Sequence, residues 1–339
     1  MKKIFTLMFC LCALGASATI WRLNNNLAVE ADFRTFAEAQ EAASAGDTIF
    51  VEGNGMANHY GQITITKKLV LIGPGYFLDE NDSTYVNGNF ARFMSITVQS
   101  TAPGTEIYGI YLFSGDYNIR YLTIRASNVI AARNFFNPHD YEAIRIDSVV
   151  QNVTIAQNFA YRIDIAAAAS NFIISNNYIH DRINLNPSSN GIISNNVIST
   201  GIFNAYNSQI KNNILFAMSG GDVFTYPNTG NFISYNILSG ALGTGSYGPG
   251  NVANVSMADV FLGYPSQGNY SRDQRWQLKP DGPAAGAGEE EIDCGMFGGA
   301  LPYILSGLPA VPRVYEAVVP TAGSTSAGLP VIIKIKSQN

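Results

Sequence analysis

A short motif recurs through the middle of the chain at steps of about twenty residues, and this repeat limits the possible folds more than any other feature. An isoleucine stands three residues before a shared asparagine in every copy but the first, which has Ala131, and an apolar residue follows it by two. The shared asparagines are Asn134, Asn158, Asn177, Asn196, Asn213 and Asn236. Repeats of this length without helical periodicity predict a solenoid of short strands, one coil per repeat.

Strict alternation along a strand would place the two apolar positions of each copy on opposite faces. We therefore expect the chain to bend at the asparagine, which tolerates the left-handed backbone conformation better than other non-glycine residues. Stacked coils would bring the asparagine side chains to about 4.8 Å from one another, where they can hydrogen-bond as a ladder. A leucine-rich horseshoe lacks support because its Leu spacing does not occur, so the pattern predicts an all-β parallel β-helix.

The asparagine repeat resembles the right-handed parallel β-helices of the pectin-lyase-like superfamily over roughly residues 45–300. The stretches 278–285 and 293–298 resemble the closing coil of uncharacterised secreted bacterial β-helix proteins. The resemblance implies a right-handed parallel β-helix solenoid with an N-terminal capping helix. It implies no single activity, because the superfamily holds lyases, hydrolases, epimerases and adhesins.

The ends of the chain carry their own signals. Residues 1–18 read as a signal peptide, in which Lys2 and Lys3 precede an apolar run and a small-residue cleavage site. We expect a strand and cap helix in 19–53, where Thr35 and Glu38 form a capping box. We expect the β-helix itself in 54–300, and a Pro/Gly-rich β-hairpin in 301–339 that covers the last coil; a sorting or attachment module is the alternative for this segment.

Composition restricts the partners and the location of the protein. Charged residues make up 13% of the chain and the pI is 5.2, which argues against a nucleic-acid partner. Beyond the signal peptide, the sequence has no apolar run of the length that spans a membrane, and its one remaining cysteine, Cys294, excludes an internal disulfide. We expect an exported protein that is secreted, periplasmic or held at the cell surface.

Three successive coils carry an Arg-Ile-Asp or Arg-Ile-Asn triplet, at 145–147, 162–164 and 182–184. With each isoleucine inward, the flanking residues point outward on one face. We expect a column of arginines beside a column of acids and an amide, formed by Arg145, Arg162 and Arg182 and by Asp147, Asp164 and Asn184. Such a stripe could bind the carboxylates of an acidic polysaccharide through forked hydrogen bonds. The alternative is a self-neutralising lattice that keeps the face soluble, each exposed pair contributing about 0–1 kcal/mol.

Aromatic residues provide a second candidate binding feature. Several tyrosines fall where strands or bends are expected to face water: Tyr161, Tyr178, Tyr206 and Tyr235. Exposed aromatic rings stack on pyranose rings, so we expect Tyr161 and Tyr178 to contact polysaccharide. The alternative is that tyrosines of neighbouring coils stack on one another and stabilise the solenoid.

Candidate catalytic residues come from the same coils. Residues 136–140 are similar to a motif of the mannuronan C5-epimerases, whose Tyr, Asp and His serve proton transfer. Only His139 is kept here, because Asn134 and Asn137 stand at the other two positions and an amide cannot act as acid or base. Likeness to pectate-lyase-like enzymes would give Arg162 or Arg182 the task of neutralising a uronate. It would also place Asp147 and Asp164 on calcium, as two of the six to eight oxygen ligands that calcium takes.

The sequence leaves three functions open. The first is a non-catalytic exported protein that binds polysaccharide, the second a lyase acting on an acidic, uronate-containing glycan, and the third a structural adhesin or spacer. The sequence indicates no cofactor for the first and third functions, and calcium is the candidate cofactor for the lyase. The sequence favours binding because it lacks a complete catalytic set: the adjacent aspartates and Gly-His-Gly of polygalacturonases do not occur in it.

Overall fold

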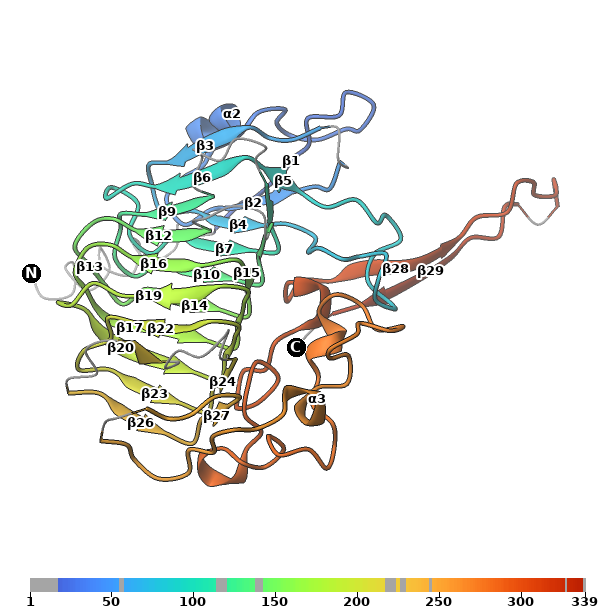
Figure 1. The fold of residues 1–339 in the computed structure, drawn as a ribbon. Coiled ribbons are helices and arrows are strands. Elements are labelled where there is room, and N and C mark those ends of the chain that lie inside the picture. The colour runs from blue at the N-terminus through green and yellow to red at the C-terminus, as the bar shows by residue number, and fades with distance from the viewer. Residues whose placement is uncertain are drawn as a thin grey trace, which may run out of the picture.

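The computed structural model describes residues 18–54, 58–113, 121–137, 143–216, 224–225, 230–243, 246–326 and 328–337. Within them the predicted all-β parallel β-helix is confirmed, because three parallel sheets run along the whole solenoid (Figure 1). The predicted signal peptide lies outside the described residues, apart from Ala18.

The first sheet holds the longest strands. In spatial order they are β1 (Ile20–Leu23), β2 (Thr48–Val51), β4 (Val70–Ile72), β7 (Glu106–Tyr108), β10 (Ile130–Ala132), β14 (Thr154–Ala156), β17 (Ala169–Ser175), β20 (Asn190–Ser194), β23 (Gln209–Lys211) and β26 (Phe232–Ser234), and β13 (Val150–Gln151) also pairs with β17.

The second sheet is made of two-residue strands. They are β5 (Arg92–Phe93), β8 (Tyr111–Leu112), β11 (Phe135–Phe136), β15 (Phe159–Ala160), β18 (Tyr178–Ile179), β21 (Val197–Ile198), β24 (Ile214–Leu215) and β27 (Ile237–Leu238). The third sheet carries the predicted stripe. Its strands are β3 (Gln62–Ile65), β6 (Ser95–Val98), β9 (Leu122–Ile124), β12 (Ile144–Ile146), β16 (Ile163–Ile165), β19 (Arg182–Asn184), β22 (Gly201–Phe203) and β25 (Phe224–Thr225).

The predicted asparagine ladder is confirmed at the turn between the first and second sheets. All six shared asparagines are fully buried. In the middle of the ladder, Asn177 Nδ2 donates to Asn196 Oδ1 at 2.9 Å, and Asn177 Oδ1 accepts from Asn158 Nδ2 at 3.0 Å. Asn251 extends the ladder by one step, since its Oδ1 accepts from Asn236 Nδ2 at 2.9 Å.

The backbone bend falls one residue earlier than expected. The residue before each ladder asparagine has a φ between 55° and 58°, as at Arg133, Gln157 and Asn176. This left-handed residue turns the chain, and the ladder asparagine after it points into the core. The expectation that the ladder asparagine itself adopts the left-handed conformation is therefore wrong.

The cap helix closes the first coil as expected. Helix α2 (Phe36–Ala42) begins at Thr35, whose side chain accepts from the Glu38 amide while the Glu38 side chain accepts from the Thr35 amide. Phe36 and Ala39 are buried against the core, and the helix lies at the blue end of the solenoid (Figure 1).

The chain behind the last coil differs from the expectation. The strands of the solenoid end at Leu238 instead of near residue 300. The chain then stacks once more on the last coil, where Val252 pairs with Ile237 in parallel. Residues 256–312, here called the return segment, run back along the second sheet toward the first coils (Figure 1). The return segment contains α3 (Met257–Val260) and three 3-10 turns (Gln274–Trp276, Glu289–Glu291 and Leu305–Gly307). The two stretches that resemble a closing coil, 278–285 and 293–298, belong to this segment.

The left-handed residues of successive coils bind the return segment in order. Asn195 Nδ2 donates to the carbonyl oxygen of Asp293 at 3.2 Å. On the coil before it, Asn176 Nδ2 donates to the carbonyl oxygen of Gly298 at 2.7 Å. Nearer the N-terminus, Arg133 Nη1 donates to the carbonyl oxygen of Leu308 at 2.9 Å. From the first of these bonds to the last, the donor residues come earlier in the chain and the acceptor residues come later. The segment therefore runs opposite to the stacking direction of the coils.

The predicted C-terminal hairpin forms but does not cover the last coil. Strands β28 (Arg313–Val318) and β29 (Ile332–Lys336) are antiparallel and project from the side of the solenoid (Figure 1). Their base contacts a loop near the first coils, where Arg313 Nε donates to the Thr84 carbonyl at 2.9 Å and the Val86 amide to that of Val314 at 3.1 Å. The expected position is wrong because the return segment first carries the chain back along the solenoid.

Candidate functional site

The outer face of the third sheet presents polar side chains between buried apolar ones. Successive strands have an apolar-x-apolar pattern whose apolar residues are buried, as in Ile144-Arg-Ile146 and Ile163-Asp-Ile165. The middle residue of each strand points outward because side chains alternate along a strand. The outward column that contains Arg145 and Asp164 continues with Asn184 and Phe203.

The strand register aligns only part of the predicted stripe. Arg162 and Arg182 lie side by side, because Ile163 pairs with Ile183 and Asp164 with Asn184, as expected. Arg145, however, pairs with Asp164 rather than Arg162. The expected column of three arginines is therefore wrong at Arg145: the coil that carries it is displaced by two residues, so an arginine lies beside an acid.

Asp164 is the centre of this face. Its side chain is 4% exposed, and Arg162 Nε lies 2.7 Å from Asp164 Oδ2. Asp164 Oδ1 accepts from Arg162 Nη2 at 2.7 Å and from Asn184 Nδ2 at 3.1 Å. Arg162 is itself only 16% exposed. A buried carboxylate thus holds the guanidinium of Arg162 in one orientation.

Amide groups extend this arrangement toward later coils. Asn184 Oδ1 accepts from Asn204 Nδ2 at 2.9 Å, so Asp164, Asn184 and Asn204 form a chain of hydrogen bonds across three coils. Charge-assisted and amide hydrogen bonds of this kind fix side chains that would otherwise be mobile. The face is therefore rigid and offers both hydrogen-bond donors and acceptors.

Arg182 lies at the edge of this chain and is more accessible. Its side chain is 34% exposed, and its Nε lies 3.7 Å from Asp181 Oδ2. The Arg182 Cζ atom lies 5.3 Å from the centre of the Phe203 ring. Nearby, the Tyr161 ring lies 5.3 Å from that of His180. This edge combines a cation with partly exposed aromatic rings.

Asp147 has a different partner from the one expected. Its Oδ1 and Oδ2 accept from Arg125 Nε at 2.9 Å and Arg125 Nη2 at 3.0 Å in a forked pair, and this pairing raises the pKa of Arg125. Arg125 follows Ile124 as Asp147 follows Ile146, and these isoleucines are paired. Arg125 was not among the residues predicted from the sequence, although the repeated apolar-x-apolar pattern marks its position.

The two aspartates are not aligned on neighbouring strands. Ile146 pairs with Ile165, which places Asp147 two residues along the sheet from the Arg145–Asp164 pair. Both carboxylates have arginine partners, and the described residues contain no cluster of three or more His, Cys, Asp or Glu side chains that could hold a metal ion. The fit to calcium at Asp147 and Asp164 is therefore poor.

The expected exposure of the tyrosines is only partly correct. Tyr178 is buried, at 4% exposure, because it faces the return segment and stacks on Trp276 with ring centres 4.6 Å apart. Burial raises the pKa of Tyr178 to about 12. The expectation that Tyr178 faces water is wrong, and it cannot contact a polysaccharide in this conformation. Tyr161, Tyr206 and Tyr235 are half-buried.

The remaining catalytic candidate, His139, lies outside the described residues.

The described part of the face has a small excess of positive charge. It contains four arginines, Arg125, Arg145, Arg162 and Arg182, and three aspartates, Asp147, Asp164 and Asp181. Such a set can hold an anion by forked hydrogen bonds. The described residues include no helix long and apolar enough to cross a membrane.

Comparisons with known proteins add little to this geometry. No family model and no curated protein matches the chain. Among solved structures, the chain is similar to the pectin methylesterase from Aspergillus niger in deglycosylated form, with 12% sequence identity and a TM-score of 0.35. The match covers 78% of this chain and 91% of that one. A likeness this low supports no conclusion about function, and the parallel β-helix is established by the three sheets themselves.

Proposed function

We propose that the protein is exported and binds an acidic polysaccharide, without cleaving it, on the outer face of the third sheet. The observation that carries the proposal is the buried Asp164, which fixes Arg162 while Arg145 and Arg182 lie on the neighbouring strands to either side. The three arginines come from successive coils, whose strands are spaced by about 4.8 Å; Arg162 and Arg182 are aligned, and Arg145 is offset from them by two residues along the strand. A polyanion lying along the solenoid would meet one of them at each coil.

The same geometry argues against a general acid or base at this face. Arginine stays protonated in proteins, and Asp164 is enclosed by Arg162 and Asn184. The half-buried Tyr161 and Phe203 beside Arg182 would contribute apolar contact to sugar rings. These features suit recognition of a charged glycan better than proton transfer.

A titration with polygalacturonate, alginate and chondroitin tests the proposal. We expect Arg182→Gln to weaken binding by about tenfold, which corresponds to the loss of one charged hydrogen bond. Lys68→Gln removes an exposed charge away from this face and serves as the matched control. Affinity for wild-type protein should fall as salt screens the exposed charges. Equal affinity of Arg182→Gln and wild type would contradict the proposed location.

An absorbance measurement separates binding from the lyase alternative. A lyase would release unsaturated uronates, so we expect a flat ultraviolet trace for wild-type protein on all three polymers, with and without calcium. Absorbance that grows and is lost in Arg162→Ala would replace the binding proposal by a lyase with its site on this face.

A further inference from the structure

The C-terminal hairpin carries a contiguous group of exposed apolar side chains. Fifteen large apolar side chains are exposed in the described part of the chain, and seven of these lie within residues 318–335. Their exposed fractions run from 47% to 66%, and they are Val318, Val319, Leu329, Val331, Ile332, Ile333 and Ile335. Single apolar residues are normal on a protein surface, whereas a group of them in one place indicates an interaction site.

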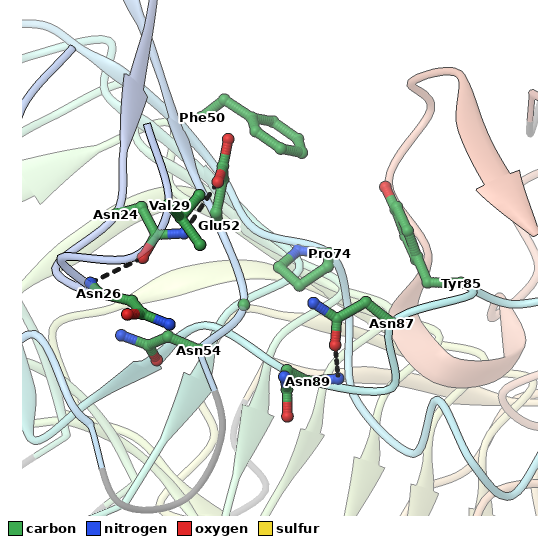
Figure 2. Close-up of a pocket in the computed structure, with 11 residues that line it drawn as sticks. Asn24, Asn26, Val29, Phe50, Glu52, Asn54, Pro74, Tyr85, Asn87 and Asn89 are labelled. Atoms are coloured by element: carbon green, nitrogen blue, oxygen red, sulfur yellow. Dashed lines mark hydrogen bonds between the residues drawn. The ribbon is translucent and has the colours of Figure 1, made fainter. Parts of the chain in front are cut away.

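The rest of the described chain leaves this surface uncovered. The hairpin is held at its base, where Arg313 Nε and Nη2 donate to the carbonyl oxygens of Thr84 and Ser83 at 2.9 Å and 3.2 Å. Beyond the base it projects away from the solenoid (Figure 1). Tyr85, the next residue of the same loop, lines the pocket drawn in Figure 2, which has a volume of about 250 Å³ and five asparagines in its lining. None of the described hairpin residues lines this polar pocket, so it offers the exposed isoleucines and valines no cover.

The strand register sorts the side chains of the hairpin onto two faces. Ile333 pairs with Ala317 and Ile335 with Val314, and residues directly opposite one another share a face. Val319 and Val331 fall on the same face, because side chains alternate along each strand. We call this surface the apolar face; its residues are Val314, Ala317, Val319, Val331, Ile333 and Ile335.

The charged residues of β29 and the glutamate opposite them lie on the other face. Glu316 pairs with Lys334 in the register, and Lys334 Nζ lies 2.7 Å from Glu316 Oε2. Lys336 lies two residues beyond Lys334 and therefore on the same side of the strand. The apolar face thus carries no charged side chain. A partner with charges on its contact surface would lose their hydration there without gaining a counter-ion.

A second copy of the chain is the partner that the apolar face fits. A two-fold interface brings the same surface of both copies together, so this surface must be complementary to itself. The apolar face meets this condition, because its side chains are apolar and no like charges are brought together. Pairing through the open edge of β29 is less favourable, since lysines such as Lys334 and Lys336 on an edge strand oppose the addition of another strand.

The exposed area of the apolar face sets the strength of such a dimer. Val319, Val331, Ile333 and Ile335 are 59%, 47%, 57% and 66% exposed. Their exposed parts amount to on the order of 400 Å² in each copy, or about 800 Å² in two copies. Stable complexes bury roughly 1,200–2,000 Å², so this contact belongs to the weak, concentration-dependent class. A two-stranded ribbon is marginally stable alone, and packing against a second ribbon would stabilise it.

We propose that two copies of the protein form a weak two-fold dimer in which the apolar faces of their hairpins pack against each other. Packed sheets lie about 10 Å apart with their side chains interdigitated, which would bury the isoleucines and valines of both ribbons. The dimer does not depend on the function proposed for the outer face of the third sheet.

Sedimentation velocity of the purified protein, from about 1 μM to about 300 μM, tests the proposal. We expect monomer at the low end and a growing fraction of dimer at the high end, because an interface of this size is weak. Ile333→Lys should weaken the dimer at least about tenfold, since two-fold symmetry brings the new charge close to its copy. Ile332→Lys is the matched control: the two isoleucines are adjacent and are 55% and 57% exposed, but Ile332 lies on the other face.

A salt series separates this contact from association between charged surfaces. The apolar face is uncharged, so we expect 0.5 M sodium chloride to leave the dimer as strong as it is at low salt. Ile335→Thr keeps a side chain branched at Cβ and supplies a second variant of the apolar face. Circular dichroism should show the same melting temperature for all variants and wild type, because each replaced side chain is exposed.

Three results would overturn the proposal: wild type stays monomeric at every concentration, Ile332→Lys and Ile333→Lys weaken the dimer equally, or salt abolishes it. Because no glycan is present in these measurements, such a failure leaves the binding of acidic polysaccharide intact, which is tested separately by Arg182→Gln.

Discussion

Two aspartates on the outer face of the third sheet have arginine partners but different surroundings. Asp164 and Arg162 are 4% and 16% exposed, whereas Asp147 and Arg125 are 18% and 40% exposed. Charges that remain in water lose little when a partner is removed, because solvent screens them. A buried charge without its partner is much less favourable. The two pairs therefore have different energetic importance despite similar geometry.

Replacing each aspartate by asparagine measures this difference. We expect Asp164→Asn to lower the free energy of unfolding by about 3 kcal/mol, since it leaves the Arg162 charge buried and uncompensated. Asp147→Asn is the matched control, with an expected loss below about 1 kcal/mol. Urea unfolding followed by circular dichroism gives both values. Equal losses would show that burial does not decide the strength of these pairs.

At this scale the sequence predicted which residues point outward but not how they align. The alignment of 162–164 with 182–184 was correct. The expected alignment of 145–147 with 162–164 was wrong, because the isoleucines on either side of Arg145, Ile144 and Ile146, pair with Ile163 and Ile165. Burial of the isoleucines sets the register, and a shift of two residues keeps every isoleucine inward. The polar triplet thus carries less information about register than the core does.

Among the elements of the solenoid, the asparagine ladder is the most cooperative. Asn177 Nδ2 donates to the carbonyl oxygen of Ile155 at 2.9 Å as well as to Asn196 Oδ1. Its Oδ1 also accepts from the backbone N–H of Asn158 at 2.8 Å. The side chain thus binds three neighbouring positions of the turn. If the Asn177 side chain were removed, each group that it binds would be left in the dry interior without a hydrogen bond.

Removing one ladder side chain tests that role. We expect Asn177→Ala to lower the free energy of unfolding by at least about 3 kcal/mol, because several buried groups lose partners worth about 1–3 kcal/mol each. Asn269→Ala, at an exposed position, should change it by less than about 0.5 kcal/mol. Thermal and urea unfolding provide the measurement. A small effect of Asn177→Ala would mean that the turns are held by the backbone alone.

The return segment is the element that sequence patterns did not predict. It has no repeat, and two of its anchors, Trp276 on Tyr178 and Asn176 on Gly298, join residues about a hundred or more positions apart. Local patterns such as capping boxes and alternation carry no information about such contacts. For the same reason the burial of Tyr178 could not be read from its place in the repeat.

Truncation of Trp276 should detach this segment in part. Trp276 is 6% exposed and contacts Tyr178 and Phe261, whose ring centres lie 4.6 Å and 5.2 Å away. We expect Trp276→Ala to cost about 3–5 kcal/mol of stability and to make residues 256–312 sensitive to protease before the solenoid is cut. Cleavage spread evenly over the chain would contradict a segment that detaches as a unit.

At the scale of the whole molecule, a buried thiol and a buried phenol with raised pKa values make the free energy of unfolding sensitive to alkaline pH. Burial raises the pKa of both Cys294 and Tyr178 to about 12, from ordinary values of 9.0 and 10.0. The unfolded chain releases these protons at lower pH than the folded one. Stability is therefore fully present below about pH 9 and falls as the pH rises toward 12.

A pH series of unfolding experiments with Cys294→Ala tests this linkage. Between pH 9 and 10 the thiol should account for a fall of about 1 kcal/mol in the free energy of unfolding. We expect the variant to lose this part of the slope and to keep the steeper fall above pH 10, where tyrosines ionise. A variant with the same slope as wild type over pH 9–10 would contradict the burial of the thiol.

The whole fold was more predictable than its function. The repeat predicted the coil, the ladder and the inward residues because each is set by local periodicity and stacking. The function depends on which outward side chains converge, and this follows from register and from the return segment. The offset of Arg145, which lies beside Asp164 and not beside Arg162, shows this most clearly.

The most direct test of the account is a hydrogen–deuterium exchange footprint of the full protein with and without an oligogalacturonate. If the outer face of the third sheet binds acidic glycan, the ligand should slow hydrogen exchange in peptides that contain 143–147, 162–166 and 182–186. Exchange in the hairpin of β28 and β29 should stay the same. Protection confined to other parts of the chain, or no protection at saturating ligand, would contradict the proposed binding face.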